Sequence, residues 1–179
     1  MAVNKRICFV CLGNIVRSPL AKNLFMRLAQ ESGKVDYYEV DSAGTSGWHI
    51  GEPPDERMLR IAARHGWKYD GRARQFKTKD FDRFDLIIVM DQENLLDLTR
   101  LGCNESESKK IHLMREFDPE GGPKQAVPDP YDAGLNSFEE VYQIIERSCR
   151  GWLQHLDEGR KNDRPIPKLE RGQENPDGA

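Results

Sequence analysis

The sequence contains few cysteines, no long apolar run and no excess of basic charge. Four of its 179 residues are cysteine, and 27 lysines and arginines stand against 30 aspartates and glutamates, for a net charge of -3. A few scattered cysteines argue against a disulfide scaffold, and the mildly acidic balance argues against a nucleic-acid-binding domain. No apolar run approaches the roughly 20 residues of a membrane-spanning helix, so we expect no membrane contact either.

The two ends of the chain differ in character. Residues 1–6 lead directly into an apolar segment without the features of a signal peptide, so a cytoplasmic location is the expectation. The length suits one domain with its own core, which we predict to span residues 1–158. In residues 159–179 apolar side chains thin out among charges, proline and glycine, and this polar tail is predicted to be disordered.

Short apolar runs alternate with amphipathic segments along the rest of the chain. The runs predict strands at residues 5–11, 37–41, 85–90 and 111–114. Helical spacing predicts helices from about Pro19 to Gly33, at 55–65, from 91 to about 101, and over 138–156. Glycine and proline predict loops at 43–54 and 116–130. This alternation indicates an α/β fold with a parallel sheet covered on both faces, a three-layer α/β/α arrangement.

Cys8 and Cys11 form a Cys-x-x-Cys pair, a spacing also found in redox and zinc motifs. In redox motifs the pair opens a helix, whereas here Cys8 lies inside a predicted strand. Three extended residues separate the two Cα atoms by about 10 Å, beyond the roughly 7 Å that a disulfide tolerates, and the side chains point to opposite faces. No second Cys-x-x-Cys or His pair completes a zinc site. Neither redox cycling nor metal binding is therefore predicted.

The segment from Cys11 to Ser18, CLGNIVRS, lies between the first predicted strand and the first predicted helix. A helix N-terminus and a nearby cation favour the reactive thiolate form of cysteine. The backbone N–H groups of the loop can surround an anion, and the fork of Arg17 can bind two oxygens of one phosphate. Gly13 and Asn14 suit the unusual backbone angles of such a loop. The alternative is a small buried cysteine that ends a strand beside a surface arginine.

The segment VPDPYD at residues 127–132 offers a partner acid for the nucleophile. Expelling an alkoxide or phenolate without protonation is slow, so a carboxyl group near the leaving oxygen is needed. Prolines on both sides of Asp129 restrict the loop and fix the direction of its carboxylate. Tyr131 adds an aromatic surface for a planar substrate group. A plain turn is the alternative, because Asp-Pro clusters are common in turns.

VCLGNIVRSP together with the distant DPYD resembles the low-molecular-weight protein tyrosine phosphatases. The similarity runs from about Lys5 to about Leu156 and includes DSAGTSGW, RHG and the strand that ends in Met90-Asp91. The resemblance implies a four-stranded parallel sheet with an N-terminal phosphate-binding loop. It also implies two-step hydrolysis of protein phosphotyrosine through a phosphoenzyme, with no metal or other cofactor. Inorganic phosphate would then be both the product and a competitive ligand.

The resemblance further implies roles for single residues. Cys11 would be the nucleophile, Arg17 the phosphate clamp, and Asp129 the general acid and then the base toward water. The phosphate-binding loop would comprise Leu12, Gly13, Asn14, Ile15, Val16, Arg17 and Ser18. A polar network of Asn14, Ser18, Ser42 and His65 would hold that loop, and Leu12, Ile15, Trp48, Tyr131 and Asp132 would line the substrate slot. Taken alone, His65 is equally a helix C-terminal histidine, Ser42 a turn residue and Trp48 a loop anchor.

Two positions depart from the family pattern. Val16 stands where many members have a second cysteine that protects the nucleophile, so we expect Cys11 to overoxidise more readily. Asp132 follows Tyr131 and should disfavour acidic segments around the substrate. Three alternatives to phosphotyrosine hydrolysis remain: phosphoarginine hydrolysis, arsenate reduction, and phosphate binding without catalysis. Ile15 favours a phenyl ring over phosphoarginine, and Cys103 and Cys149 are spaced unlike an arsenate-reductase relay.

Overall fold

Four parallel strands in the order β2-β1-β3-β4 form the centre of the computed structural model, which describes residues 3–122 and 125–162. The strands are β1 (Lys5–Cys11), β2 (Tyr38–Gly44), β3 (Leu86–Val89) and β4 (Ile111–Leu113). The helices are α1 (Arg17–Glu31), α2 (Glu56–Arg64), α3 (Asp80–Arg83), α4 (Gln92–Arg100), α5 (Glu105–Ser108) and α6 (Leu135–Asn162), with 3-10 turns η1 (Val35–Tyr37) and η2 (Met114–Phe117). The predicted parallel α/β sheet is confirmed.

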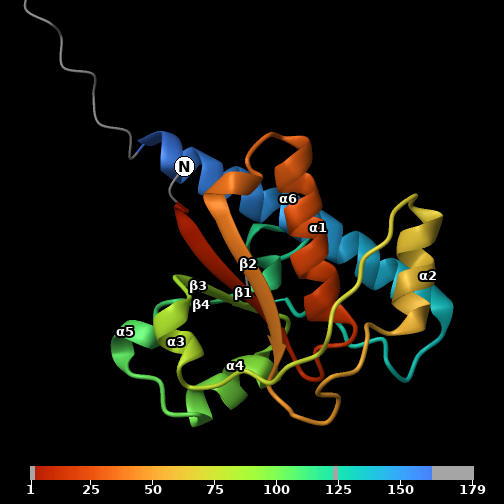
Figure 1. The fold of residues 1–179 in the computed structure, drawn as a ribbon, viewed down its shortest axis with the longest axis horizontal. Helices are drawn as coiled ribbons and strands as arrows, with labels where there is room; N and C mark the ends of the chain where they lie inside the picture. Colours follow the sequence, from red (N-terminus) through yellow and green to blue (C-terminus); the bar gives the residue numbers. More distant parts are fainter. Residues whose placement is uncertain (1–2, 123–124, 163–179) are drawn as a thin grey trace, which may run out of the picture.

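Helices cover both faces of the sheet (Figure 1). On one face, α1, α2 and α6 contribute side chains such as Leu24, Ile61 and Ile145 to a buried cluster. On the other face, Phe81 of α3 and Leu98 of α4 belong to a second cluster. Period-two alternation along β1 assigns neighbouring residues to different clusters. The three-layer arrangement is therefore confirmed.

Cys8 and Cys11 belong to these two different clusters. All four cysteines are free thiols. Burial raises the pKa of the Cys8 thiol, which makes this sulfur a poor nucleophile. The prediction that the pair points to opposite sides of the sheet is confirmed.

Several element boundaries differ from the predicted ones. Strand β2 runs to Gly44 rather than residue 41, because its pairing with β1 continues to Gly44, which lies opposite Cys11. Helix α1 begins at Arg17, not near Pro19. The short α3 and α5 were not predicted, and neither was η2, because four residues are too few to show a helical period.

The C-terminal helix is longer than predicted. Helix α6 begins at Leu135 and continues through Gly159 to Asn162, so the first part of the expected polar tail is helical. Residues 163–179, the rest of that expected tail, lie outside the described residues. The division of the chain at residue 158 stays a prediction.

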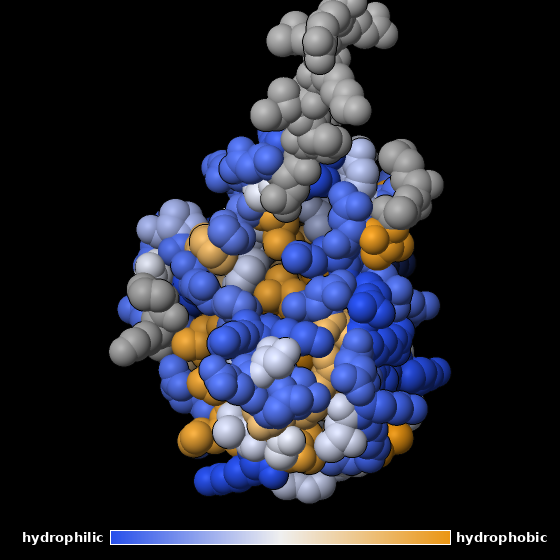
Figure 2. Space-filling model, turned by 90° about the vertical axis from the view of Figure 1, so that its left-hand side faces the viewer, coloured by the Kyte–Doolittle hydropathy of each residue, from blue (hydrophilic) through white to orange (hydrophobic). Residues whose placement is uncertain are grey.

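The visible surface is largely hydrophilic. In Figure 2 hydrophilic residues cover most of one face, and hydrophobic residues lie on it as separate patches. None of the helices in the described part of the chain has the length and apolar character needed to span a bilayer.

Candidate active site

The Cys11 sulfur lies at the carboxyl end of β1, where a short loop leads into α1. Its Sγ is 3.0 Å from Ser18 Oγ and accepts a hydrogen bond from the Asn14 N–H at 3.3 Å. Among the described residues no side chain caps the N-terminus of α1. The first N–H groups of an α-helix have no partner within the helix, and without a side-chain cap they are available to bind an anion. We call residues 11–18 the phosphate loop.

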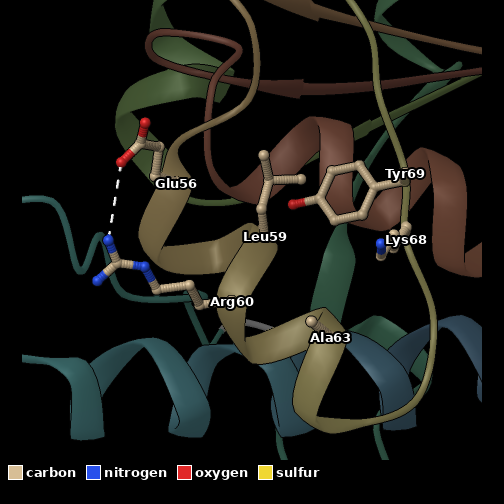
Figure 3. A pocket seen from close by; sticks show the side chains of 6 residues that line it. All are labelled: Glu56, Leu59, Arg60, Ala63, Lys68 and Tyr69. Carbon is tan, nitrogen blue, oxygen red and sulfur yellow. Dashed lines mark ion pairs between the residues drawn. The ribbon is translucent and has the colours of Figure 1, made fainter.

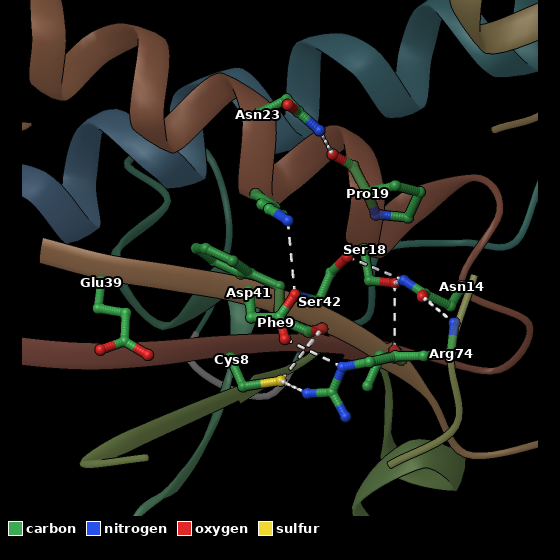
Figure 4. Close-up of polar contacts among 12 residues, drawn as sticks. Cys8, Phe9, Asn14, Ser18, Pro19, Asn23, Glu39, Asp41, Ser42 and Arg74 are labelled. Carbon is green, nitrogen blue, oxygen red and sulfur yellow. Dashed lines mark hydrogen bonds and ion pairs between the residues drawn. The ribbon is translucent and has the colours of Figure 1, made fainter. Parts of the chain in front are cut away.

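Asn14 holds this loop in an unusual shape. Its φ of 56° lies in the left-handed region, which costs about 1 kcal/mol for a residue with a side chain. The Asn14 amide donates to Ser18 Oγ at 2.8 Å and to Ser42 Oγ at 3.0 Å, and its oxygen accepts from the Arg74 N–H at 2.9 Å (Figure 4). The three predicted supporting residues Asn14, Ser18 and Ser42 therefore lie together.

The structure does not bring His65 to this network, so its predicted role there is wrong. His65 is the C-cap of α2, its Nε2 lies 2.7 Å from Glu139 Oε1, and its ring stacks on Tyr142. The fourth member of the network is instead the backbone N–H of Arg74. Every residue except proline has a backbone N–H, so the residue type does not show which one is used, and the sequence did not reveal this donor.

Glycine allows β2 to end against the phosphate loop. A Cβ atom on Gly44 would lie 2.7 Å from the Leu12 carbonyl oxygen, closer than real Cβ contacts. The Thr45 and Ser46 N–H groups then donate to the carbonyl oxygens of Cys11 and Leu12 at 2.8 and 2.9 Å. The loop is thus supported from the β2 side as well.

Arg17 is almost fully buried, with 2% of its side chain exposed. It donates to Asp91 Oδ2 at 2.7 Å, to the Val127 carbonyl oxygen at 2.9 Å and to Asp129 Oδ2 at 3.1 Å. Burial alone would lower the pKa of the Arg17 guanidinium, but electrostatic interactions with Cys11 and Asp129 and the hydrogen bond to Asp91 raise it. Arg17 therefore keeps its positive charge in a buried position, and three groups fix its orientation.

Asp91 is a functional neighbour that sequence reasoning missed. The sequence predicts that it begins a helix, and it does cap α4, accepting from the Asn94 N–H at 2.8 Å with Oδ1. Its second oxygen holds Arg17. Because this contact joins residues that are 74 positions apart, only the sheet topology reveals it.

A cavity of about 360 Å³ opens above the Cys11 sulfur. Its walls contain Cys11, Leu12, Gly13, Ile15, Val16, Arg17, Trp48, His49, Asp129, Tyr131 and Asp132. All predicted slot residues are in this set. Trp48 is 74% exposed and Tyr131 43% exposed, so both stand at the mouth. Asn14, Ser18 and Ser42 lie outside the cavity, as supports.

His49 is a cavity residue that sequence reasoning missed. Its ring centroid lies 6.1 Å from that of Tyr131, and its Nδ1 is 2.8 Å from Glu52 Oε2. The mouth of the cavity therefore combines three rings, Trp48, His49 and Tyr131, with the carboxylate of Asp132.

Comparisons with known proteins agree with this geometry. Residues 6–162 match the family model described as low molecular weight phosphotyrosine protein phosphatase. A low molecular weight protein-tyrosine-phosphatase of Streptomyces coelicolor is 42% identical over 149 residues, covering 83% of this chain and 91% of that protein. The human low molecular weight phosphotyrosine protein phosphatase is 43% identical over 152 residues, covering 84% and 94%. The chain belongs to this family.

A solved structure is also similar to this phosphatase. The crystal structure of a protein tyrosine phosphatase from Entamoeba histolytica superposes with a TM-score of 0.82 at 35% identity, covering 87% of this chain and 99% of that chain. The predicted family, fold and enzyme class, a protein-tyrosine-phosphatase, are therefore confirmed.

This phosphatase has a further cavity, of about 440 Å³, on the outer side of α2 (Figure 3). It is lined by Glu56, Leu59, Arg60, Ala63, Lys68 and Tyr69. None of the predicted site residues is among them. The two cavities therefore share no lining residue.

Proposed function

We propose that this phosphatase hydrolyses phosphotyrosine in proteins through a cysteinyl-phosphate intermediate on Cys11. The main support is that the Cys11 sulfur, the Arg17 guanidinium and the Asp129 carboxylate border one cavity. Relatives of this chain are named as phosphotyrosine protein phosphatases. In this proposal the phosphate loop binds the phosphoryl group and the aromatic mouth binds the tyrosine ring.

In the first step the Cys11 thiolate attacks phosphorus, and an S–P bond forms as the P–O bond to the tyrosine breaks. The protonated Asp129 carboxyl gives its proton to the leaving phenolate oxygen. Arg17 binds two equatorial oxygens of the transferred group, and the N–H groups of the phosphate loop bind the remaining charge. Asp91 and the Val127 carbonyl keep the guanidinium in the required plane.

In the second step water attacks the phosphorus of the intermediate. The Asp129 carboxylate takes a proton from that water, the S–P bond breaks, and the Cys11 thiolate returns. Ser18, whose Oγ is 3.0 Å from the sulfur, stabilises the leaving thiolate with a hydrogen bond. Inorganic phosphate leaves as the product and competes with substrate for the same loop.

The shape of the cavity supports an aryl phosphate as substrate. Ile15 presents an apolar side chain, and Trp48 and Tyr131 flank the entrance. A phosphotyrosine ring fills this passage, whereas the shorter phosphoserine would leave its phosphate above the sulfur. Asp132 at the mouth repels acidic segments of a substrate, so we expect a preference for neutral or basic surroundings.

The direct test is a comparison of turnover on a phosphotyrosine peptide, a phosphoserine peptide, free phosphoarginine and, with an added thiol reductant, arsenate, all in the presence of a metal chelator. We expect hydrolysis of phosphotyrosine without added metal and little turnover of the other three. Preferred turnover of phosphoarginine or arsenate would assign one of the alternative activities instead. Binding of phosphotyrosine with no turnover would assign a non-catalytic phosphate-binding module. A strict need for magnesium would contradict the mechanism.

A further inference from the structure

Arg57, the second residue of α2, contacts two segments that border the active site without lining the cavity itself. Its Nε and one terminal nitrogen donate to the two carboxylate oxygens of Asp55 at 3.0 and 2.8 Å. Its other terminal nitrogen donates to the Tyr131 carbonyl oxygen at 2.7 Å. The flat guanidinium also lies 5.2 Å from the centre of the Tyr131 ring and 4.5 Å from that of Phe138. Five donors in a fixed plane make arginine suited to such a bridge.

The two partners of Arg57 are hydrogen-bonded to two different parts of the proposed active site, the phosphate loop and the general acid. The Asp55 N–H donates to the Ile15 carbonyl oxygen at 2.8 Å, which ties Asp55 to the phosphate loop. The Tyr131 N–H donates to Asp129 Oδ1 at 3.1 Å, which ties the Tyr131 peptide to the general acid. Arg57 therefore closes a chain of hydrogen bonds from the phosphate loop to Asp129.

The segment that contains the acid has few other attachments. We call residues 128–134 the acid loop. Among the described residues, the side chains that hydrogen-bond to it from outside are Arg17, through Asp129, and Arg57, through the Tyr131 carbonyl. When Arg17 turns its donors to a bound phosphate, the Arg57 contact remains to hold the loop in place.

We propose that Arg57 is a positioning residue that holds the acid loop at the distance from the phosphate loop at which Asp129 reaches the leaving oxygen. The proposal rests on the proposed function, because it assumes that Asp129 is the general acid. Arg57 itself touches neither the substrate nor Cys11 in this scheme. It acts through the Tyr131 peptide, and a displacement of about 1 Å at a reacting group can cost about 100-fold in rate.

The test uses Arg57→Met, which keeps a long side chain against Tyr131 and Phe138 but removes every donor. The matched control is Arg60→Met on the same helix, since Arg60 is 66% exposed and, within the part of the chain that the structure describes, forms an ion pair only with Glu56, at 3.8 Å (Figure 3). The measured quantity is kcat/KM for aryl phosphates with leaving groups from para-nitrophenol to phenol. It reports the steps up to the first P–O cleavage, where the acid acts.

We expect the loss in Arg57→Met to grow with the basicity of the leaving group. It should be roughly threefold for para-nitrophenyl phosphate, which needs little protonation, and about 100-fold for phenyl phosphate. Arg57→Lys should lie in between, because lysine can donate to the Tyr131 carbonyl but cannot also bind both oxygens of Asp55. Arg60→Met should match the wild type. The dependence of kcat/KM on leaving-group basicity does not change with the folded fraction of the variant, because an unfolded fraction lowers kcat/KM for every substrate by the same factor.

An equal loss for every leaving group, or a wild-type slope, in Arg57→Met would overturn the positioning role and leave the proposed function intact. If Arg57→Met shows no cooperative unfolding, Arg57→Lys decides, and a wild-type slope in that variant overturns the proposal. Failure of the wild type to hydrolyse any aryl phosphate would instead overturn the proposed function.

Discussion

Asn14 shows how a single side chain fixes the shape of the phosphate loop. The left-handed backbone at this position is unfavourable, and it is compensated by hydrogen bonds to Ser18, Ser42 and the Arg74 N–H. Because the Asn14 side chain makes all three hydrogen bonds, replacing it would remove them together. The unfavourable backbone conformation of Asn14 is thus offset by the hydrogen bonds that its side chain makes with buried polar groups.

We expect Asn14→Ala to lower the free energy of unfolding by about 1–3 kcal/mol, since it leaves buried donors and acceptors without partners. Turnover of para-nitrophenyl phosphate should fall as well, because the loop loses the support behind its left-handed residue. Urea unfolding and steady-state kinetics measure the two effects. Asn23→Ala is the control, because the Asn23 side chain donates to the Pro19 carbonyl oxygen on the same helix, α1, and it should change both values little. Wild-type stability and turnover in Asn14→Ala would remove the supporting role.

Asp129 is the second residue whose role can be tested alone. Asp129→Ala should reduce kcat/KM by about 100-fold or more for phenyl phosphate and much less for para-nitrophenyl phosphate, because only the basic leaving group needs its proton. The same series of aryl phosphates supplies the measurement. A loss of the same size across the series would remove Asp129 as the general acid.

At the scale of secondary-structure elements, the buried carboxylate of Asp118 holds a helix against a neighbouring segment. Asp118 follows η2 and is 4% exposed. It accepts from Arg115 at 2.9 Å, from Arg147 of α6 at 3.1 Å and from the Glu120 N–H at 3.0 Å. Burial alone would raise the pKa of the Asp118 carboxyl, but hydrogen bonds from Arg147, Glu120 and Arg115 bring it below its ordinary value. The carboxylate therefore fastens α6 to the segment after β4.

A lowered pKa makes this contact sensitive to acid in a defined direction. The stabilisation is complete above the unfolded pKa of about 3.9 and is lost as the pH falls through the lower folded value. Asp118→Asn should lower the free energy of unfolding at pH 7 by about 1–3 kcal/mol. It should also flatten the decline of stability below about pH 4, measured by urea unfolding. Asp36→Asn is an exposed control that should change neither. An acid decline as steep as that of the wild type in Asp118→Asn would contradict this role.

The helices that the sequence predicted are those with enough residues to show a helical period, whereas the strands were predicted from short apolar runs. The buried run of β1 and the apolar face of α6 are long, whereas α3 and α5 contain four residues each and were missed. At the site, the segment from Cys11 to Ser18 was found because its residues are adjacent in sequence. The contact of Asp91 with Arg17 was not found, because the sheet brings together residues from two different strand ends.

At the scale of the whole molecule, the parallel sheet brings the residues of the proposed site together at one edge, formed by the carboxyl ends of its strands. The phosphate loop follows β1, and Asp91 follows β3. The Val127 N–H donates to the Met90 carbonyl oxygen at 2.8 Å, which draws the distant acid loop toward the same edge. Ligands of α/β folds bind at the carboxyl ends of the strands, and the proposed site lies there.

A ligand that binds this edge should stabilise the entire fold. Inorganic phosphate at about 100 times its Kd should add about 2.7 kcal/mol, which corresponds to a rise in Tm of roughly 5–10 °C for a chain of this size. Sodium chloride at equal ionic strength is the control, and differential scanning fluorimetry is the measurement. Arg17→Lys should lose most of the shift, because lysine cannot bind two phosphate oxygens in one plane. A full shift in Arg17→Lys would place the phosphate elsewhere.

The most direct test of the covalent mechanism is intact-protein mass spectrometry after acid quench during turnover of para-nitrophenyl phosphate. We expect one phosphoryl group on Cys11 in the wild type and in Cys103→Ser, whose replaced thiol is free and lies outside the cavity. Cys11→Ser should show no appreciable turnover. Sustained turnover in Cys11→Ser, together with a wild-type enzyme that never shows the adduct, would contradict nucleophilic catalysis by Cys11.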